Sequence, residues 1–218
     1  MNIDTLLYFG SFDPPHFAHK AVMEHAYRLV KPKQVEMVVI ARTGTSKVLS
    51  DETHRVNLAK KFTGNLNLPV SVNTVDIECK LSGKTIETVL ELKKRSPHRK
   101  LGLLFGSDQL PSFDSWQRSN DLRALAKCFF VRRSGDKNVH RYIRPGQYLL
   151  PAAPVKRGAL TSLEIKQHLH YGNSDALEQA MPRDVLDYIS SHNLYDKFFQ
   201  KLPHLLEPEK LDGTNFGG

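Results

Sequence analysis

Cysteine and long apolar stretches are scarce in this 218-residue chain, and their scarcity argues against several classes of protein. The two cysteines, Cys79 and Cys128, are far apart and form no CxxC spacing, so neither a disulfide framework nor a cysteine-based zinc site is indicated. No apolar run approaches the roughly 20 residues that a membrane-spanning helix needs. The first residues also lack the basic segment of an export signal. We therefore expect a cytoplasmic protein with no membrane partner.

Charge is abundant, and it is mainly positive. The formal net charge is +8 at pH 7, which favours anionic partners such as nucleotides, nucleic acids or acidic membranes without choosing between them. The densest basic run, residues 93–95 followed by Arg99 and Lys100, ends a predicted helix, where cations stabilise the helix dipole. We interpret that run as a solvated helix end and expect no nucleic-acid partner.

Strand and helix patterns alternate along the first two-thirds of the chain. Apolar runs predict strands at 5–9, 35–40, 100–105, 128–133 and 147–150, and alternation predicts another at 70–77. Helical spacing predicts helices at 18–30, 52–62 and 85–94. Buried strands separated by helices are typical of a parallel sheet covered on both faces. The pattern therefore predicts an α/β fold, a Rossmann-like doubly wound parallel sheet, in which ligands lie beyond the carboxyl ends of the strands.

The last third of the chain is more helical. Helices are predicted at 162–170, 176–180 and 182–191. We find no internal repeat and no linker, so we expect a single domain over residues 1–200. Residues 201–218 have little periodicity and end in glycine, which predicts a flexible C-terminal tail.

The most informative string is GSFDPPHFAH, residues 10–19, directly after the first predicted strand. Gly10 permits a sharp exit from the strand and close approach to a ligand. His16 and His19 are three residues apart at the start of a helix, so they share one face. A helix N-terminus attracts anions, and imidazoles there could donate hydrogen bonds to the charge that grows on a phosphoryl group during transfer.

Two other interpretations of this string are weaker. A histidine pair could be part of a metal centre, but no third ligand stands at a recognisable spacing, so no protein-held metal is predicted. Ser11, Asp13 and His16 could suggest a hydrolase triad, but they lack the GxSxG turn between strand and helix.

The string resembles the signature of the nucleotidyltransferase superfamily with an HxGH motif. Its form is most similar to bacterial nicotinate mononucleotide adenylyltransferases, whose segment reads roughly GG[ST]FDPxHxGH. Phe9 and Ala18 stand where that family has glycines. The resemblance implies that His16 and His19 are catalytic contacts to ATP phosphates and that Gly10, Ser11 and Phe12 also contribute to ATP binding.

Later segments extend the resemblance over roughly residues 5–195. LTSLEIK at 160–166 stands where the family has ISSTxIR, which implies ATP contacts from Thr161, Ser162 and Lys166. Lys166 replaces an arginine, and it keeps the charge without the planar fork. Lys47 matches a family lysine without its usual preceding PPH, and a solvated loop lysine is an equal alternative.

The resemblance also implies an acceptor site for a pyridine mononucleotide. KTIETVLEL resembles the family's SYTIDTL segment, with Gly83 and Lys84 in place of serine and tyrosine. The segment from Gly106 resembles a GxD motif followed by a tryptophan. The implied contacts are Thr85, Gly106, Asp108, Trp116 and Arg133. Thr85 could instead be a helix cap, and Trp116 a core residue.

The implied reaction joins ATP and nicotinate or nicotinamide mononucleotide, with Mg²⁺ accompanying ATP, and releases pyrophosphate. A related transferase with another phosphate acceptor or with CTP, a class I aminoacyl-tRNA synthetase fragment, and a non-catalytic nucleotide sensor are the alternatives. The changes at Gly83, Lys84, Leu163 and Lys166 motivate the sensor. The choice between nicotinate and nicotinamide and the presence of a homo-oligomer stay open at the level of sequence.

Overall fold

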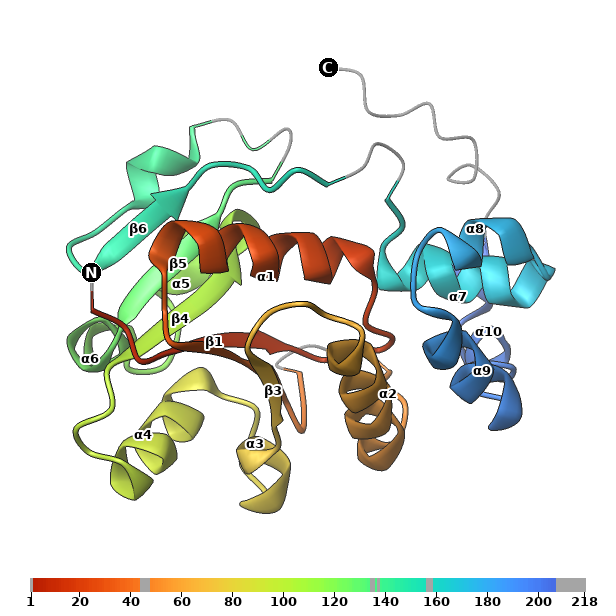
Figure 1. Ribbon diagram of the computed structural model, residues 1–218, viewed down its shortest axis with the longest axis horizontal. Coiled ribbons are helices and arrows are strands. Elements are labelled where there is room, and N and C mark those ends of the chain that lie inside the picture. The colour runs from red at the N-terminus through yellow and green to blue at the C-terminus, as the bar shows by residue number, and fades with distance from the viewer. Residues whose placement is uncertain (1, 44–47, 134–135, 137, 156–158, 207–218) are drawn as a thin grey trace.

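A parallel sheet forms the centre of the molecule. The structure is a computed structural model that describes residues 2–43, 48–133, 136, 138–155 and 159–206. Every strand pair is parallel, and the order is β3-β2-β1-β4-β5-β6 (Figure 1). The strands are β1 (Thr5–Gly10), β2 (Gln34–Val39), β3 (Val70–Asn73), β4 (Leu101–Gly106), β5 (Lys127–Val131) and β6 (Gln147–Leu150). The order reverses between β1 and β4, so the predicted doubly wound α/β fold is confirmed.

Helices fill the connections and the C-terminal part. They are α1 (Phe17–Val30), α2 (Glu52–Gly64), α3 (Val75–Glu78), α4 (Thr85–Arg95), α5 (Leu110–Phe113), α6 (Ser119–Leu125), α7 (Ser162–Tyr171), α8 (Ser174–Glu178), α9 (Arg183–Ser191) and α10 (Phe198–Lys201). Single turns of 3₁₀-helix are η1 (Ser107–Gln109), η2 (Val139–Tyr142) and η3 (Pro203–Leu206). Within the described residues, none of these helices is both long enough and apolar enough to span a lipid bilayer.

Two apolar cores lie on opposite faces of the sheet, because successive side chains of a strand point to opposite sides. Leu6 of β1 packs in the core that includes Met23 of α1 and Leu58 of α2. Leu7 packs in the other core, with Val89 of α4 and Phe130 of β5. Figure 1 shows α1 and α4 on the two sides of the sheet.

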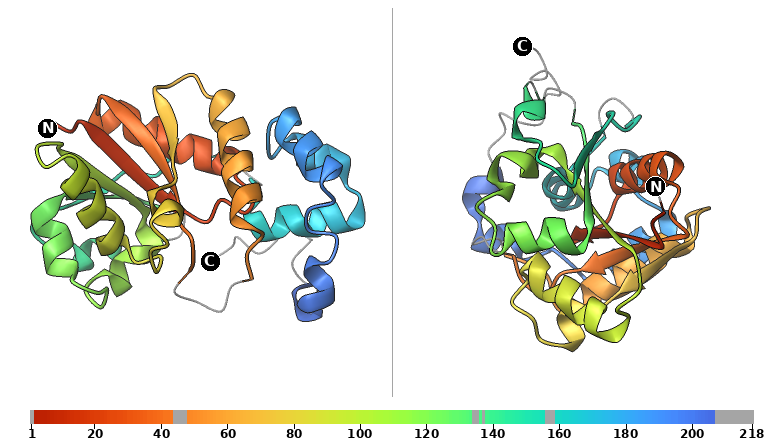
Figure 2. Two further views of the ribbon diagram at one scale, coloured as in Figure 1. Left: turned by 90° about the horizontal axis from the view of Figure 1, so that it is seen from below. Right: turned by 90° about the vertical axis from the view of Figure 1, so that its left-hand side faces the viewer.

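The C-terminal helices gather beyond the carboxyl end of the sheet, next to the loop that follows β1 (Figure 2, left). Several contacts attach them there, among them two side-chain hydrogen bonds. Ser162 Oγ at the start of α7 donates to the carbonyl of Pro14 at 3.0 Å. Tyr188 of α9 accepts a hydrogen bond from Asn57 of α2 at 2.9 Å. The C-terminal part therefore borders the edge where the α/β fold binds ligands.

The strand predicted over residues 70–77 is too long. β3 ends at Asn73, whose side-chain oxygen accepts a hydrogen bond from the Val75 amide at 3.0 Å and turns the chain into α3. Asp76, a residue of α3, is buried and accepts bonds from the Ala41 amide at 2.6 Å and from Thr88 Oγ1 at 2.8 Å. A continued strand would leave those donors without the carboxylate.

The start of the expected C-terminal tail has regular structure. Residues 203–206 form η3, where the carbonyl of Leu205 accepts a hydrogen bond from Gln167 Nε2 at 2.7 Å. Residues 207–218 lie outside the described part of the chain, so the flexible tail stays a prediction for them.

Candidate active site

A cavity of about 670 Å³ opens at the point where the strand order reverses. Its walls come from the carboxyl ends of β1 and β4, the residues after β2, the first turn of α4, and the 108–117 segment. Eight residues that the sequence singles out share this lining: Gly10, Ser11, His19, Thr85, Gly106, Asp108, Trp116 and Arg133. The fold thus brings together residues that are more than 100 positions apart in the chain.

The turn after β1 depends on the packing between Gly10 and Phe12. Phe12 has a left-handed backbone, with φ of 47°, and its ring is buried at 1% exposure. A Cβ on Gly10 would stand 2.8 Å from Phe12 Cζ, closer than real side chains approach. The peptide bond between Asp13 and Pro14 is cis. Phe12, expected as a nucleotide contact, therefore supports the turn from beneath.

The two motif histidines lie against each other at the N-terminus of α1. Their ring centroids are 3.8 Å apart, and the backbone N–H of His16 donates to His19 Nδ1 at 3.2 Å. That bond favours the tautomer of neutral His19 with its proton on Nε2. His19 can therefore present an N–H donor to an anion in the cavity, while His16 is 7% exposed at the base of the same turn.

Asp13 and Lys166 form an ion pair in the interior. Lys166 Nζ lies 2.9 Å from Asp13 Oδ2, and the two side chains are 2% and 0% exposed. Asp13 also accepts hydrogen bonds from Tyr195 Oη at 2.9 Å and from the Ser50 amide at 3.2 Å. Burial opposes the charge on Asp13, but Lys166 and these donors hold the pKa of the carboxyl below its usual value. The ammonium expected at the ATP phosphates thus neutralises Asp13.

Arg55 holds the loop after β1 against both ends of the connection between β2 and α2. The residue is 1% exposed, and its guanidinium donates to the carbonyls of Ser50, Ser11, Ile40 and Ala41 at 3.0, 3.3, 2.6 and 3.1 Å. Burial lowers the pKa of Arg55, although Asp13 opposes that shift. The residue pattern gives no sign of this role, because carbonyl acceptors lie on the backbone and leave no trace in the sequence.

Part of the cavity wall carries an ion pair. Asp108 Oδ1 lies 3.0 Å from Arg133 Nε, and Gly106 lies beneath the pair, since a Cβ there would stand 2.3 Å from Asp108 Oδ1. Ser107 accepts a hydrogen bond from the Arg133 amide at 2.9 Å and donates to Asp136. Beneath the cavity, burial raises the pKa of Tyr8 well above its usual value, so Tyr8 stays neutral.

Aromatic side chains line the far end of the cavity. Trp116 packs edge-on against Phe105, with ring centroids 5.2 Å apart, and against Phe113 at 4.9 Å. It is therefore part of the apolar packing and part of the cavity wall at once. A flat ring exposed in this way can stack on a planar ligand.

The loop before α4 is held tightly against the residues after β2. Gly83 has φ of +83°, and a Cβ there would stand 2.1 Å from the carbonyl oxygen of Arg42. Lys84 is the N-cap of α4 and Thr85 its first residue, and both line the cavity. Gly83, which departs from the family pattern, is therefore explained by sterics, because a side chain there would clash with the Arg42 carbonyl.

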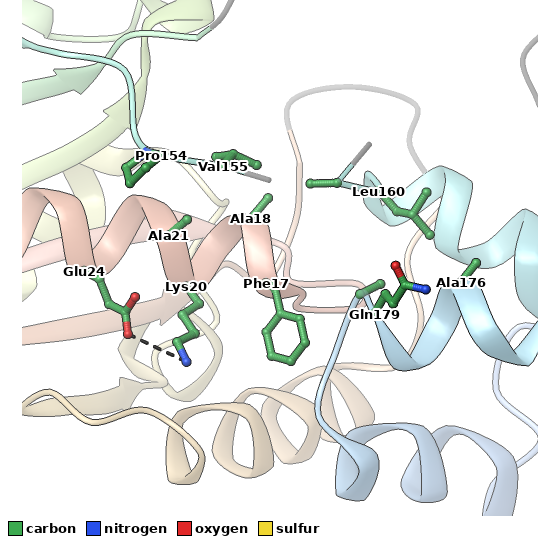
Figure 3. A pocket seen from close by; sticks show the side chains of 12 residues that line it. Phe17, Ala18, Lys20, Ala21, Glu24, Pro154, Val155, Leu160, Ala176 and Gln179 are labelled. Carbon is green, nitrogen blue, oxygen red and sulfur yellow. Dashed lines mark ion pairs between the residues drawn. The ribbon is translucent and has the colours of Figure 1, made fainter. Parts of the chain in front are cut away.

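A second cavity, of about 560 Å³, lies along the other side of the α1 N-terminus. Figure 3 shows Ala18 and Ala21 pointing from α1 toward Pro154 and Val155, with Leu160 nearby. Thr161 follows Leu160 directly and caps α7, accepting a hydrogen bond from the Glu164 amide at 3.3 Å. A mostly apolar slot thus leads toward the first turns of two helices.

The predicted site residues fall into three groups. The first group is the eight residues that line the main cavity. The second group lies at the start of α7 and consists of Thr161 and Ser162. The third group is buried behind the turn after β1 and consists of Phe12, His16 and Lys166. Lys47 lies outside the described residues. No group of three histidine, cysteine or acidic side chains in the described part of the chain is placed to hold a metal ion. The ligand contacts themselves stay predictions.

Comparison with known proteins places the chain in a family. The cytidylyltransferase-like family model matches residues 7–192. The chain is 30% identical to a probable nicotinate-nucleotide adenylyltransferase of Leptospira interrogans over 90% of its own length and 98% of the relative's. The chain is also 32% identical to the protein of the same name from Herpetosiphon aurantiacus, over 85% of its own length and 95% of the relative's.

The fold has a solved counterpart. The Plasmodium falciparum nicotinic acid mononucleotide adenylyltransferase complexed with NaAD matches with a TM-score of 0.76 and 20% identity, covering 89% of this chain and 98% of that one. With a family model spanning residues 7–192 and relatives of at least 30% identity along most of its length, this chain belongs to the cytidylyltransferase-like nucleotidyltransferases and groups there with the nicotinate-nucleotide adenylyltransferases.

Proposed function

We propose that this protein transfers the adenylyl group of ATP to the phosphate of nicotinate mononucleotide, giving the dinucleotide of NAD biosynthesis and pyrophosphate. The observation that carries the proposal is the arrangement of two cavities on either side of the α1 N-terminus, where His19 lies. Two nucleotides placed there would meet with their phosphates at the motif histidines. The names of the relatives supply the identity of the acceptor.

ATP fits the side of α1 that carries the apolar cavity. The adenine ring would lie in the slot beside Ala18 and Leu160. Ala18 adds a single methyl group where the family has glycine, and the cavity beside it has a volume of about 560 Å³. The triphosphate would run along the N-termini of α1 and α7, where helix amides and the dipole favour anions. His16, His19, Thr161, Ser162 and Lys47 are the side chains proposed to contact it, with Gly10 and Ser11 supplying backbone.

The mononucleotide fits the main cavity. Its pyridine ring would stack on Trp116, with Thr85 at its edge, and Asp108 and Arg133 above Gly106 would hold the ribose and phosphate. Lys84, at the start of α4, brings a positive charge to the lining of the same cavity, and it forms no ion pair within the described residues. A cation beside the pyridine ring favours the carboxylate of nicotinate over the neutral amide of nicotinamide.

The transfer itself needs positioning and charge stabilisation. An oxygen of the mononucleotide phosphate attacks the α-phosphorus of ATP, and the bond from that phosphorus to the β-bridging oxygen breaks, so that pyrophosphate leaves with the electron pair. The attacking phosphate is already ionised, so no general base is required. The Nε2–H of His19 would donate to the charge that grows at the α-phosphoryl group. Mg²⁺ enters with ATP and supplies neutralisation of the phosphate charge.

Pyrophosphate release tests the proposal. Purified protein is supplied with ATP and Mg²⁺, and with nicotinate mononucleotide and nicotinamide mononucleotide in separate reactions. We expect release with nicotinate mononucleotide, and a loss of about 100-fold or more in kcat for His19→Asn, which removes the donated hydrogen bond at the reacting phosphorus. A folded protein that is silent with both acceptors would overturn the assignment.

A further inference from the structure

The carboxylate of Asp13 links the turn that carries the motif histidines to the C-terminal part. Asp13 collects three donors from three separate segments: Lys166 of α7 at 2.9 Å, Tyr195 after α9 at 2.9 Å, and the amide of Ser50 at 3.2 Å. Asp13 itself lies three residues before His16. Any displacement of this carboxylate would therefore move the residues that lead directly into α1.

Two aromatic rings also lie close to the Lys166 ammonium. Its Nζ lies 4.1 Å from the ring centroid of Phe198 and 4.8 Å from that of Tyr195. Cations are attracted to aromatic faces, and the effect grows when water is excluded. With 2% of its side chain exposed, the ammonium is held between a carboxylate and two rings in the protein interior.

We propose that Lys166 is a positioning residue, which aims His16 and His19 through its ion pair with Asp13, and that it is not a ligand of the ATP phosphates. The inference rests on the proposed transfer reaction for its kinetic consequences.

Charge energetics favour this role over phosphate binding. To reach a phosphate, Lys166 would have to leave Asp13, whose carboxylate is 0% exposed. An uncompensated buried charge is far more costly than the pair. The family arginine is expected at a phosphate, but in this chain the charge retained at position 166 has a fixed partner 153 positions earlier. α7 is attached to the same turn a second time, through Ser162 and the carbonyl of Pro14.

A double-mutant cycle separates the two roles. The variants are Asp13→Asn, Lys166→Met and the double variant, with Lys94→Met as the matched control, since Lys94 is exposed near the end of α4. Each is assayed for kcat and for KM of ATP, at a temperature well below its own thermal midpoint. Binding of ATP with Mg²⁺ is measured in parallel by calorimetry, so that one readout does not depend on turnover.

If Lys166 is a positioning residue, the two single substitutions are not additive. Each lowers kcat by about 100-fold, whereas the double variant is no worse than either single one, because both members of the pair are gone. If Lys166 contacts ATP, Lys166→Met weakens ATP binding by about tenfold or more in either background, and Asp13→Asn leaves binding unchanged or tightened. That second pattern would overturn the inference.

Tyr195→Phe provides a milder test if the charge variants do not fold. It removes one donor to Asp13, and Tyr195 lines neither of the two cavities assigned to the substrates. We expect kcat to fall by about three- to tenfold with KM for ATP nearly unchanged. A kcat equal to that of the unaltered protein would contradict the positioning role. If the unaltered protein itself releases no pyrophosphate, the transfer reaction is overturned, and the ATP-binding cycle still decides between the two roles of Lys166.

Discussion

The ring of Phe12 lies against Gly10 so closely that a Cβ on Gly10 would meet three of its ring atoms at 2.8, 2.9 and 3.2 Å. The ring cannot easily yield, because it is 1% exposed and also packs edge-on against His19 at 5.2 Å. We expect Gly10→Ala to cost about 1–3 kcal/mol of unfolding free energy and to displace His19. Urea unfolding and pyrophosphate release should both show a loss.

Gly64→Ala is the matched control for that substitution. Gly64 ends α2, and a Cβ there would meet no atom within 4 Å. We expect unchanged activity and a stability equal to the unaltered protein or higher by up to about 1 kcal/mol, because alanine is the better helix former. Equal stability losses at both glycines would show that the contact with Phe12 carries no special cost.

The fold was largely predictable because its strands are nearly continuous apolar runs. β6 spans the residues that the pattern indicates, and β1 and β4 differ by single residues at their ends. α5 and α6 were not predicted, since helices of four and seven residues are too short to show a period. Asp76 misled the prediction, because its place in an alternating run hides its role as a buried acceptor for the Ala41 amide.

The candidate site was less predictable than the fold. Local patterns identify residues at strand ends and helix starts, and eight of the predicted site residues share one cavity. They give no information on long-range partners, so the sequence assigned Lys166 to a ligand although its charge is paired with Asp13. The pairing of Asp108 with Arg133 was missed for the same reason, because both were expected to face the mononucleotide independently.

Acid should weaken the attachment between α7 and the histidine turn. The folded-state pKa of Asp13 lies below the ordinary value of 3.8 because its donors outweigh burial. The resulting stabilisation is present above pH 3.8 and is lost as pH falls through the lower folded-state pKa. We expect the unfolding free energy to fall on acidification below about pH 4, and to fall less in the Asp13→Asn, Lys166→Met double variant. Urea titrations from pH 6 to pH 3 would reveal the difference, and parallel curves for the two proteins would contradict it.

The two cysteines should differ sharply toward thiol reagents. Burial raises the pKa of the Cys128 thiol to about 12, and this residue of β5 points into the core with 0% exposure. Cys79 is only half-buried, at the end of α3. Because thiolate is the reactive form, we expect a chromogenic disulfide to modify one thiol per native chain and two in urea. Variant Cys79→Ser should leave the native protein unreactive, and fast modification of that variant would show that Cys128 is accessible.

Lys84 should set the preference for nicotinate mononucleotide. Lys84 at the start of α4 and Trp116 line the same cavity, and Ile86 in the first turn of α4 belongs to the apolar cluster against which Trp116 packs. The only other cation in the described lining is Arg133, which is paired with Asp108. An ammonium near a ligand carboxylate in a partly solvated site contributes on the order of 1 kcal/mol, and a neutral amide gains much less.

We therefore expect Lys84→Gln to lower the ratio of kcat/KM for nicotinate over nicotinamide mononucleotide by about five- to tenfold, mainly through a higher KM for the nicotinate form. Lys94→Gln removes the same charge near the opposite end of α4 and should leave the ratio unchanged, because that site is distant and screened by solvent. High salt should narrow the difference in this kcat/KM ratio between the unaltered protein and Lys84→Gln. A ratio that is equal in all three proteins would mean that the acceptor carboxylate is read by backbone donors at the start of α4, and that Lys84 has no part in the choice.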